Sequence, residues 1–364
     1  MRRPQRIDQV IPSVVEHDAV SNHTFEAQAQ LRAMGYDSEI YCRVIGPGCH
    51  DKVRPLDALP SYDDGSQWLL YQFSIGSPAG EAFAAHPAPK LLDYHNITPA
   101  ALVERWLPPL GDECRLGRTQ LASWRGLVTA SFADSRFNAD ELCSYGYRNV
   151  SVVPVMRPEV HHEAAPDGGL LERLRAAKQS GGSDWLFVGQ VAPHKAQHDI
   201  VKALACYRRA YDPKARLHVV GREMGDGYRN ALKSFVASIG LGDAVNIAGS
   251  VSVEELAAYY AAADVFVCCS DHEGFCVPVI EAMHRGVPVV AYATAALPET
   301  VRGAGVLVPE KDPNLVAAAV RTVVVDPALR AALVATAHER AASFSLDVAR
   351  QTFRDELGRA LEAA

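Results

Sequence analysis

The sequence predicts an α/β protein with two doubly wound domains, and three observations support this fold class. The chain has 364 residues, which is longer than one hydrophobic core usually supports. From Trp185 onward, short β-rich segments alternate with helical patterns, as expected for a parallel sheet whose strands are joined by helices. A less regular alternation fills the first half, and residues 156–169, rich in proline, glycine and charge, are typical of an interdomain linker.

The first half is predicted to contain strands separated by helical stretches such as HTFEAQAQLRAMG. The strand-like segments, in chain order, are QVIPSVV, SEIYCRV, WLLYQFSIG, KLLDYHN, LVTASF and SVVPV at 151–155. This pattern predicts an α/β domain that spans residues 1–157.

The second half predicts six strands, followed by two helical segments. The strands are expected at 185–189, 216–221, 244–249, 264–270, 287–292 and 305–309. Ser252 and Glu255 have the spacing of a capping box that opens the helix after the third strand. We place the second domain at residues 158–344, and a C-terminal helix, which begins near Ser345, at residues 345–364.

Composition restricts the class of protein. The net charge is −7, with 36 basic and 43 acidic residues and no long basic run, which argues against a nucleic-acid-binding surface. No apolar run approaches the roughly 18 to 20 residues of a membrane span. The eight cysteines form no CxxC pair, as is typical of reduced thiols. The opening residues predict neither a signal peptide nor a transit peptide, so we expect a cytoplasmic location.

The loop DHEGFCVP follows the fourth strand of the second half and precedes a helix. Pro278 suits the first helical position, which puts Glu273 on the loop and Glu281 in the first turn. Gly274 permits a close approach of the backbone to a ligand. An anion would be bound by the amides at the helix start, those of Phe275, Cys276 and Val277. Carboxylates accept hydrogen bonds from sugar hydroxyls, so the loop fits a nucleotide sugar, although two ordinary acids near a helix start are the alternative.

The residues EGFCVPVIEAM, followed by GVPVVAY and LPET, resemble the donor-site signature of family-4 retaining glycosyltransferases. FVGQVAPHKAQHDIVKAL (187–204) and AGSVSVEELAAYYAAADVFV resemble other parts of that family's donor domain, whereas LLDYHNITPA and SFADSRFNADELCSYG fit its acceptor domain. The resemblance implies the GT-B fold, in which two Rossmann-like domains face each other across a cleft and the last helix crosses back onto the first domain.

The resemblance also implies roles for donor-site residues. Glu273 would bind hydroxyls of the transferred sugar, Glu281 the ribose, and Lys195 the diphosphate, with a solvated loop charge as the alternative for Lys195. Ser250 would lie near the base, or simply form a turn. Because the sequence has no DxD motif, we expect a metal-independent enzyme without a cofactor, in which Lys195 and backbone amides stabilise the leaving group.

Gln190 departs from the family pattern, which usually has an arginine after VG. Replacing a charge-assisted hydrogen bond with a neutral one costs about 1 to 2 kcal/mol of leaving-group stabilisation. Arg222, directly after RLHVVG, is a hypothesis for the residue that restores the charge.

In the first half, His95 matches the family's catalytic-loop histidine. Its expected role is a hydrogen bond to the donor sugar or the reacting centre, through its backbone or its ring, with Asn96 as a weaker companion. A structural histidine is the alternative. The loop HDAVSNH (17–23) stands where relatives carry a glycine pair near the diphosphate, which leaves Ser21 and Asn22 as the polar candidates.

Other polar residues are assigned structural roles. His194 and His198 have i, i+4 spacing but lack a third ligand, so no metal site is predicted. Glu299 is expected at a helix N-terminus. A basic face for a lipid-linked acceptor or a membrane surface is conceivable, but a solvated helix face is favoured for Arg115, Arg118 and Arg125.

The leading hypothesis is a retaining glycosyltransferase that moves a hexosyl unit from a nucleotide-diphosphate sugar to a hydroxyl of a carbohydrate or lipid-linked saccharide. The HEGFCVP and YHNITP variants resemble transferases of O-antigen or exopolysaccharide pathways, which implies cell-surface polysaccharide or glycolipid synthesis at the inner face of the membrane. For the sugar we favour mannose from GDP-mannose over hexoses from UDP-sugars. The alternatives are a UDP-sugar-dependent transferase, a GT-B nucleotide-sugar epimerase, and a non-catalytic transferase-like binding subunit, which Gln190 keeps open.

Overall fold

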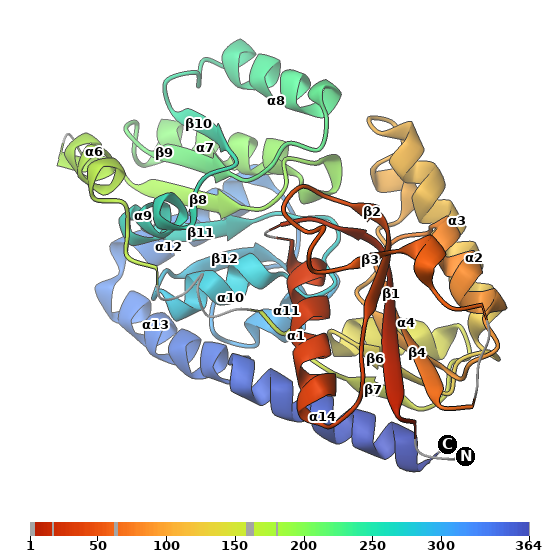
Figure 1. The fold of residues 1–364 in the computed structure, drawn as a ribbon. Coiled ribbons are helices and arrows are strands. Elements are labelled where there is room, and N and C mark those ends of the chain that lie inside the picture. The colour runs from red at the N-terminus through yellow and green to blue at the C-terminus, as the bar shows by residue number, and fades with distance from the viewer. Residues whose placement is uncertain (1–3, 17, 62–64, 158–163, 180, 364) are drawn as a thin grey trace. The chain divides into compact units, whose positions relative to one another are not determined.

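The computed structural model describes residues 4–16, 18–61, 65–157, 164–179 and 181–363, which form two compact units (Figure 1). The first unit falls within residues 1–100, 109–158 and 345–364, and the second within 101–108 and 159–344. Residues 101–108 lie within the predicted first domain but pack with the second unit, where Trp106 contacts the ring of Tyr228 at 5.7 Å. Residues 158–163, the start of the predicted second domain and the middle of the predicted linker, lie outside the described residues.

A parallel sheet of seven strands forms the centre of the first unit, in the order β3-β2-β1-β4-β5-β6-β7. All six predicted segments correspond to strands, although the last, β7, ends at Val152 and not at residue 155. The two-residue edge strand β3 is too short to produce a periodic pattern and was not predicted. The strands are β1 (Arg6–Val14), β2 (Ile40–Ile45), β3 (Arg54–Pro55), β4 (Gln67–Phe73), β5 (Lys90–Tyr94), β6 (Ala130–Ala133) and β7 (Val150–Val152).

Helices connect the strands of the first unit. They are α1 (Ala19–Ala33), η1 (Leu56–Ala58), α2 (Pro78–Ala85), α3 (Pro108–Trp124) and α4 (Arg136–Ser144), with the short turn η2 (Ala100–Leu102) at the point where the chain leaves the unit. The predicted loop 17–23 is wrong from residue 19 onward, because Asp18 accepts a hydrogen bond from the Ser21 amide at 3.0 Å and thereby caps a helix. Residue 17 lies outside the described residues.

The C-terminal helix α14 (Leu346–Glu362) belongs to the first unit. Ser345 caps it by accepting from the Val348 amide. Phe353 is fully buried and packs with residues from the sheet, including Leu70 and Phe132. Arg350 forms an ion pair at 2.8 Å with Glu26 of α1. The last segment of the chain therefore completes the core of the first unit.

The second unit contains a parallel sheet of six strands in the order β10-β9-β8-β11-β12-β13, the reversal of order that defines a doubly wound fold. All six predicted strands are confirmed. They are β8 (Asp184–Val188), β9 (Arg216–Val220), β10 (Val245–Gly249), β11 (Val265–Cys268), β12 (Val289–Tyr292) and β13 (Val306–Val308).

Helices of the second unit are α6 (Gly168–Gln179), η3 (Pro193–Lys195), α7 (Gln197–Ala210), α8 (Asp226–Ser238), α9 (Val253–Ala262), α10 (Val277–His284), α11 (Leu297–Val301), α12 (Pro313–Val325) and α13 (Pro327–Ala342). The predicted capping box of α9 is confirmed, with reciprocal bonds between Ser252 and Glu255 of 2.9 and 3.1 Å. Two helical segments were predicted after the last strand, but α12, α13 and α14 follow it. The reason is Asp326, which ends α12 and caps α13.

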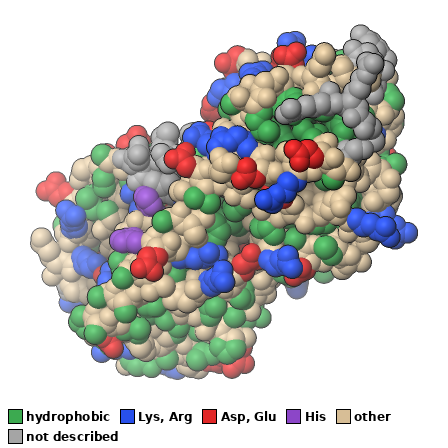
Figure 2. Space-filling model, turned by 90° about the horizontal axis from the view of Figure 1, so that it is seen from below, with side chains coloured by type: hydrophobic (Ala, Val, Ile, Leu, Met, Phe, Trp, Pro, Cys, Tyr) green, Lys and Arg blue, Asp and Glu red, His purple; other side chains and the backbone are tan. Residues whose placement is uncertain are grey.

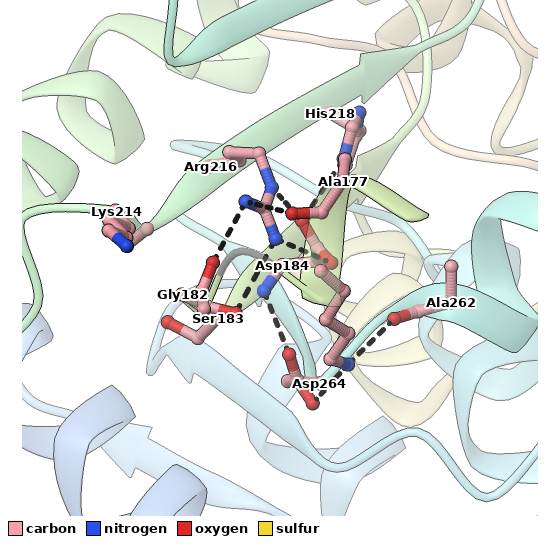
Figure 3. Close-up of polar contacts among 12 residues, drawn as sticks. Ala177, Gly182, Ser183, Asp184, Lys214, Arg216, His218, Ala262 and Asp264 are labelled. Atoms are coloured by element: carbon pink, nitrogen blue, oxygen red, sulfur yellow. Dashed lines mark hydrogen bonds and ion pairs between the residues drawn. The ribbon is translucent and has the colours of Figure 1, made fainter. Parts of the chain in front are cut away.

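Charged side chains around the buried Asp184 hold together the amino-terminal edge of the second sheet (Figure 3). Asp184 at the start of β8 pairs with Arg216 of β9 at 2.6 Å, and its amide donates to Asp264, which precedes β11. Lys178 of α6 pairs with Asp264 at 2.6 Å. Burial raises the pKa of Asp184, but hydrogen bonds from His218 and Arg216 outweigh it and lower the pKa. This network fixes β8 between its two neighbours.

The surface shows no extended area of one charge on the face drawn in Figure 2, where basic and acidic side chains are intermingled. Within the described residues, no helix combines the length and the apolar character needed to cross a membrane. Arg118 is not on a solvated face as predicted, because it bonds to Glu141 and to the carbonyl of Ile97 in the first unit. Arg115 instead pairs with Asp112 at the surface.

Truncation of Phe353, the fully buried aromatic residue of α14, tests how much this helix stabilises the first unit. We expect Phe353→Ala to lower the free energy of unfolding by about 3 to 5 kcal/mol, because it leaves a cavity beside Leu70 and Phe132. Val348→Ala in the same helix removes a side chain from a residue that is 44% exposed and should change stability by less than about 0.5 kcal/mol. Urea unfolding measures both, and equal effects would contradict the packing described.

Candidate functional site

Two loops at the carboxyl edge of the second sheet bring Lys195 and Glu273 together. Strands β8 and β11 are parallel neighbours, so the loops that follow them leave the sheet side by side. The amide of Asp271 donates to the carbonyl of His194 at 2.8 Å, which joins the two loops. Lys195 Nζ consequently lies 2.8 Å from each carboxylate oxygen of Glu273.

The Lys195–Glu273 pair is largely removed from solvent. Glu273 is 7% exposed. Burial lowers the pKa of Lys195, but the Glu273 carboxylate more than compensates, so the pKa lies above its usual value and the lysine carries a full charge. The two groups can separate their functions when a ligand binds, because an ammonium donates to phosphate oxygens and a carboxylate accepts from hydroxyl groups. Both predicted residues are thus placed in one pair.

Helix α10 begins at Val277, one residue earlier than predicted. Cys276 adopts a left-handed conformation with φ of 68° and serves as the N-cap residue, so Pro278 is the second helical residue and Glu281 lies beyond the first turn. The amides of Phe275, Cys276 and Val277 make no hydrogen bond with any described residue. They are therefore available to an anion at the positive end of the helix.

The loop before α10 is held from behind by α11. The Ala296 amide donates to the Glu273 carbonyl at 3.1 Å, and Thr300 Oγ1 donates to the Phe275 carbonyl at 2.7 Å. The Phe275 ring packs edge-on against Phe344 at 5.2 Å. These contacts fix the backbone on both sides of Gly274. Glu299, predicted to be structural, lies in the first turn of α11.

Glu281 is oriented by Tyr260, which the sequence reading did not identify. The Tyr260 hydroxyl donates to Glu281 Oε2 at 2.9 Å, and both residues are buried. Burial and the adjacent carboxylate raise the pKa of Tyr260 well above its usual value, so the phenol stays a donor. The run AAYYAAA, which contains Tyr260, has the pattern of a helix interior, and Glu281, which accepts from Tyr260, lies 21 residues further along the chain. Local patterns therefore carry no signal for this contact.

Gln190 and Arg222 lie on adjacent loops. Beyond β8 and β9 the backbones stay paired: Gly189 bonds to Val220, and the Val191 amide donates to the Arg222 carbonyl at 2.9 Å. Gly221 permits this approach, since a Cβ there would lie 2.1 Å from the Gly189 carbonyl oxygen. The Arg222 guanidinium has no hydrogen-bond or ion-pair partner among the described residues. Ser250 is an exposed residue in the turn between β10 and α9.

In the first unit, His95 is at the centre of a buried hydrogen-bond network. Its Nδ1 lies 2.9 Å from Asp134 and its Nε2 lies 2.6 Å from the side-chain oxygen of Gln72, so both nitrogens donate. Burial lowers the pKa of His95, but the carboxylates of Asp134 and Asp93 outweigh it and raise it to about 9. The ring has no uncommitted nitrogen, and a hydrogen bond from it to a sugar requires the loss of an internal bond.

A second histidine extends this network. His23 Nε2 lies 2.8 Å from Asp93 Oδ2, and its Nδ1 accepts from the Met156 amide, which fixes the tautomer with the proton on Nε2. Gln72 also donates to Gln9 at 2.8 Å. These partners were not predicted from the sequence, although polar residues inside fully buried strands are a usable signal for them.

The other candidates of the first unit serve local structure. Ser21 is fully buried, donates to Asp18 and accepts from the Val15 amide at 3.1 Å, so its hydroxyl is committed to the start of α1. Asn96 has a φ of 75° and donates to Asn138 at 2.7 Å, which supports the turn after β5. Asn22 lies half-buried on α1.

His194 and His198 do not share a helix, which removes the basis of their i, i+4 spacing. His194 lies in η3, whereas His198 belongs to α7 and contacts the Tyr228 hydroxyl at 3.0 Å. Burial lowers the pKa of His194.

The charged state of His95 is testable by pH titration. Because its folded pKa of about 9 exceeds the ordinary 6.5, its contribution to stability is complete below pH 6.5 and is lost as the pH rises through about 9. We expect a loss of about 1 to 3 kcal/mol over that window, and NMR should show the His95 ring titrating near 9. Asp134→Asn should lower this pKa toward 6.5, whereas Asp140→Asn, an exposed acid of α4, should leave it unchanged.

Comparison with known proteins places this site in a family. Residues 172–340 match the model of the family described as glycosyl transferases group 1. A D-inositol 3-phosphate glycosyltransferase of Kineococcus radiotolerans is 33% identical over 265 residues, which cover 68% of this chain and 60% of that protein. One from Geodermatophilus obscurus is 40% identical over 242 residues, covering 63% and 52%. The chain thus spans little more than half the length of these curated relatives.

Solved structures share the fold over nearly the whole chain. HepE of Anabaena, in a complex with UDP-glucose, superposes with a TM-score of 0.76 and 16% identity over 97% of this chain and 99% of its own. WaaG, a glycosyltransferase involved in lipopolysaccharide biosynthesis, superposes with a TM-score of 0.73 and 14% identity over 97% and 100%. Through residues 172–340 the chain belongs to the family of glycosyl transferases group 1, and its fold is that of the GT-B glycosyltransferases.

Proposed function

We propose that the protein is a retaining glycosyltransferase that moves a hexosyl unit from a nucleotide-diphosphate sugar to an acceptor hydroxyl. The observation that carries this proposal is the Lys195–Glu273 pair at the carboxyl edge of the second sheet, beside helix-start amides that have no described acceptor. One cation and several amides suit a diphosphate, and one carboxylate suits sugar hydroxyls. Family membership supports the same reaction class.

In the proposed reaction, negative charge develops on the departing nucleoside diphosphate. The donor's anomeric carbon–oxygen bond breaks, a bond to the acceptor oxygen forms on the same face of the sugar, and the acceptor's proton passes to a phosphate oxygen. Lys195 and the amides of the α10 start would stabilise the charge on the leaving group without reorganising. Glu273 would accept hydrogen bonds from the sugar hydroxyls. No DxD motif is present, so we propose that turnover needs no metal ion.

The roles of several other residues stay predictions. We propose that Glu281, oriented by Tyr260, accepts from the ribose hydroxyls, and that Ser250 lies near the base. For His95 we favour contact through the backbone, because both ring nitrogens are committed to Gln72 and Asp134. Internal hydrogen bonds already engage the side chains of Ser21 and Asn96, which weakens the case that either contacts the donor or the acceptor.

For the sugar and the acceptor we propose chemical classes and no single compound. The sequence favours GDP-mannose, whereas HepE was solved with UDP-glucose, so both donor types must be tested. The curated relatives are named for an inositol phosphate acceptor, and WaaG for lipopolysaccharide biosynthesis. We propose a carbohydrate or lipid-linked saccharide acceptor in cell-surface polysaccharide or glycolipid synthesis, on the cytoplasmic face of a membrane.

A panel of nucleotide sugars, tested for binding, hydrolysis and transfer with and without chelator, examines the proposed reaction. We expect one donor to raise the melting temperature and to support transfer that chelator does not lower. Lys195→Ala should reduce turnover about 10²- to 10³-fold, as loss of one transition-state donor does elsewhere, and Glu273→Gln should also reduce it. Lys233→Ala, which removes an exposed lysine from α8, is the matched control.

The same panel separates the alternatives. Acceptor-independent conversion of the donor to an epimer would indicate an epimerase. Binding without turnover in any combination would indicate a transferase-like binding subunit, and an activity that chelator abolishes would contradict metal independence.

Substitution of Gln190 tests whether Arg222 supplies the positive charge that the family's arginine would bring at position 190. If Arg222 compensates, Arg222→Ala lowers turnover about tenfold, the equivalent of one lost charge-assisted hydrogen bond. Gln190→Arg in that variant should restore it. A strong gain from Gln190→Arg alone, with no loss in Arg222→Ala, would rule compensation out. Steady-state kinetics with the active donor provide the measurement.

A further inference from the structure

The strand–loop–helix segment that carries Glu273 also carries a cluster of two thiols and a carboxylate. Cys268 ends β11, Glu273 lies on the loop, and Cys276 caps α10. One ligand atom from each of the three lies within 4.8 Å of the others. All three residues are buried, and both cysteines are free thiols. The fold therefore brings the three side chains of the sequence pattern C-x4-E-x2-C into one cluster.

The donor set matches a cation that prefers sulfur. Two thiolates and a carboxylate suit Zn²⁺ in a site with three protein ligands and one open position, whereas Mg²⁺ and Ca²⁺ require oxygen ligands. Binding would release the two thiol protons to solvent. The charges balance as well: two thiolates and Glu273 contribute −3, the cation contributes +2, and Lys195, 2.8 Å from Glu273, contributes +1.

The first unit holds another cluster of possible ligands, but its atoms are committed. His23, Asp93 and His95 also bring one ligand atom each within 4.8 Å. Both nitrogens of His23 and both nitrogens of His95 already form hydrogen bonds inside the unit, so a cation bound by one nitrogen of each ring would replace two of these bonds. In the cysteine cluster the thiols form only weak sulfur hydrogen bonds among the described residues, between Cys268 Sγ and Ser270 Oγ at 3.3 Å and between Cys268 and Cys276.

We propose that Cys268, Glu273 and Cys276 form a binding site for a thiophilic divalent cation such as Zn²⁺, and that its occupancy excludes the sugar donor. The exclusion rests on the proposed function, because it follows from the assignment of Glu273 to the sugar hydroxyls. A carboxylate that ligates the cation cannot accept from those hydroxyls with the same oxygen. The cation is thus an inhibitor of transfer and takes no part in it.

Co²⁺ is the probe for the site, because thiolate ligands give its complexes an intense charge-transfer absorption. Titration of the reduced, metal-free protein with Co²⁺ should produce this band at one equivalent, and Zn²⁺ should abolish it. Cys276→Ser and Cys268→Ala should each weaken cation affinity more than the roughly 10- to 100-fold that loss of an outer-shell partner costs. Cys143→Ser removes an exposed thiol of α4 and should leave the titration unchanged. Melting curves establish that each variant is folded.

Two results would overturn the site: no charge-transfer band in the wild type, or a band that survives unchanged in both cysteine variants. Neither depends on transferase activity. A separate arm adds GDP-mannose or UDP-glucose to the Co²⁺ complex. Loss of the band supports overlap with the donor, whereas a band that persists with a nucleotide sugar the protein turns over leaves the cation site standing and contradicts the role of Glu273.

Discussion

The parallel pairing of β8 and β11 is the constraint on which the candidate site depends. It sends the loop carrying Lys195 and the loop carrying Glu273 out of the same edge of the sheet, where the bond between Asp271 and His194 joins them. The charged side chains around the buried Asp184, at the opposite end, keep β8 in register between β9 and β11 (Figure 3). A contact between residues 78 positions apart is therefore set by strand order, not by local sequence.

In the absence of a ligand, the opposite charges of Lys195 and Glu273 neutralise each other in a largely buried position. Removal of either partner leaves an uncompensated charge in a medium of low polarity, which is costly, although the intact pair adds little net stability. A ligand that carries both an anion and hydroxyl groups can replace each partner with one of its own groups. The pair thus keeps the site neutral when no ligand is bound, and the backbone at the start of α10 supplies donors that need no rearrangement.

Residue patterns predicted the regular elements well, because the six parallel strands of the second unit each leave a short β-rich run. These patterns failed where an element was only a few residues long or where a contact joined residues far apart in the sequence. Strand β3 has two residues, and a single aspartate, Asp326, divides the helices that precede the last one. Lys195 and Glu273 were named from the family motifs and from their place beside strand ends, and the structure brings them together. The partners of His95 were not, since Gln72 and Asp134 are 23 and 39 residues from it.

The distribution of cations on these loops bears on how a diphosphate is held. Lys311 lies 2.7 Å from Asp199 and 2.5 Å from Asp271, so two carboxylates neutralise it. Lys202 also pairs with Asp199, at 2.9 Å. Lys195 has one carboxylate partner, which a sugar hydroxyl can engage in its place, and Arg222 has none among the described residues. Because Gln190 brings no charge, a diphosphate bound as we propose would depend on Lys195, the α10 amides and the guanidinium of Arg222.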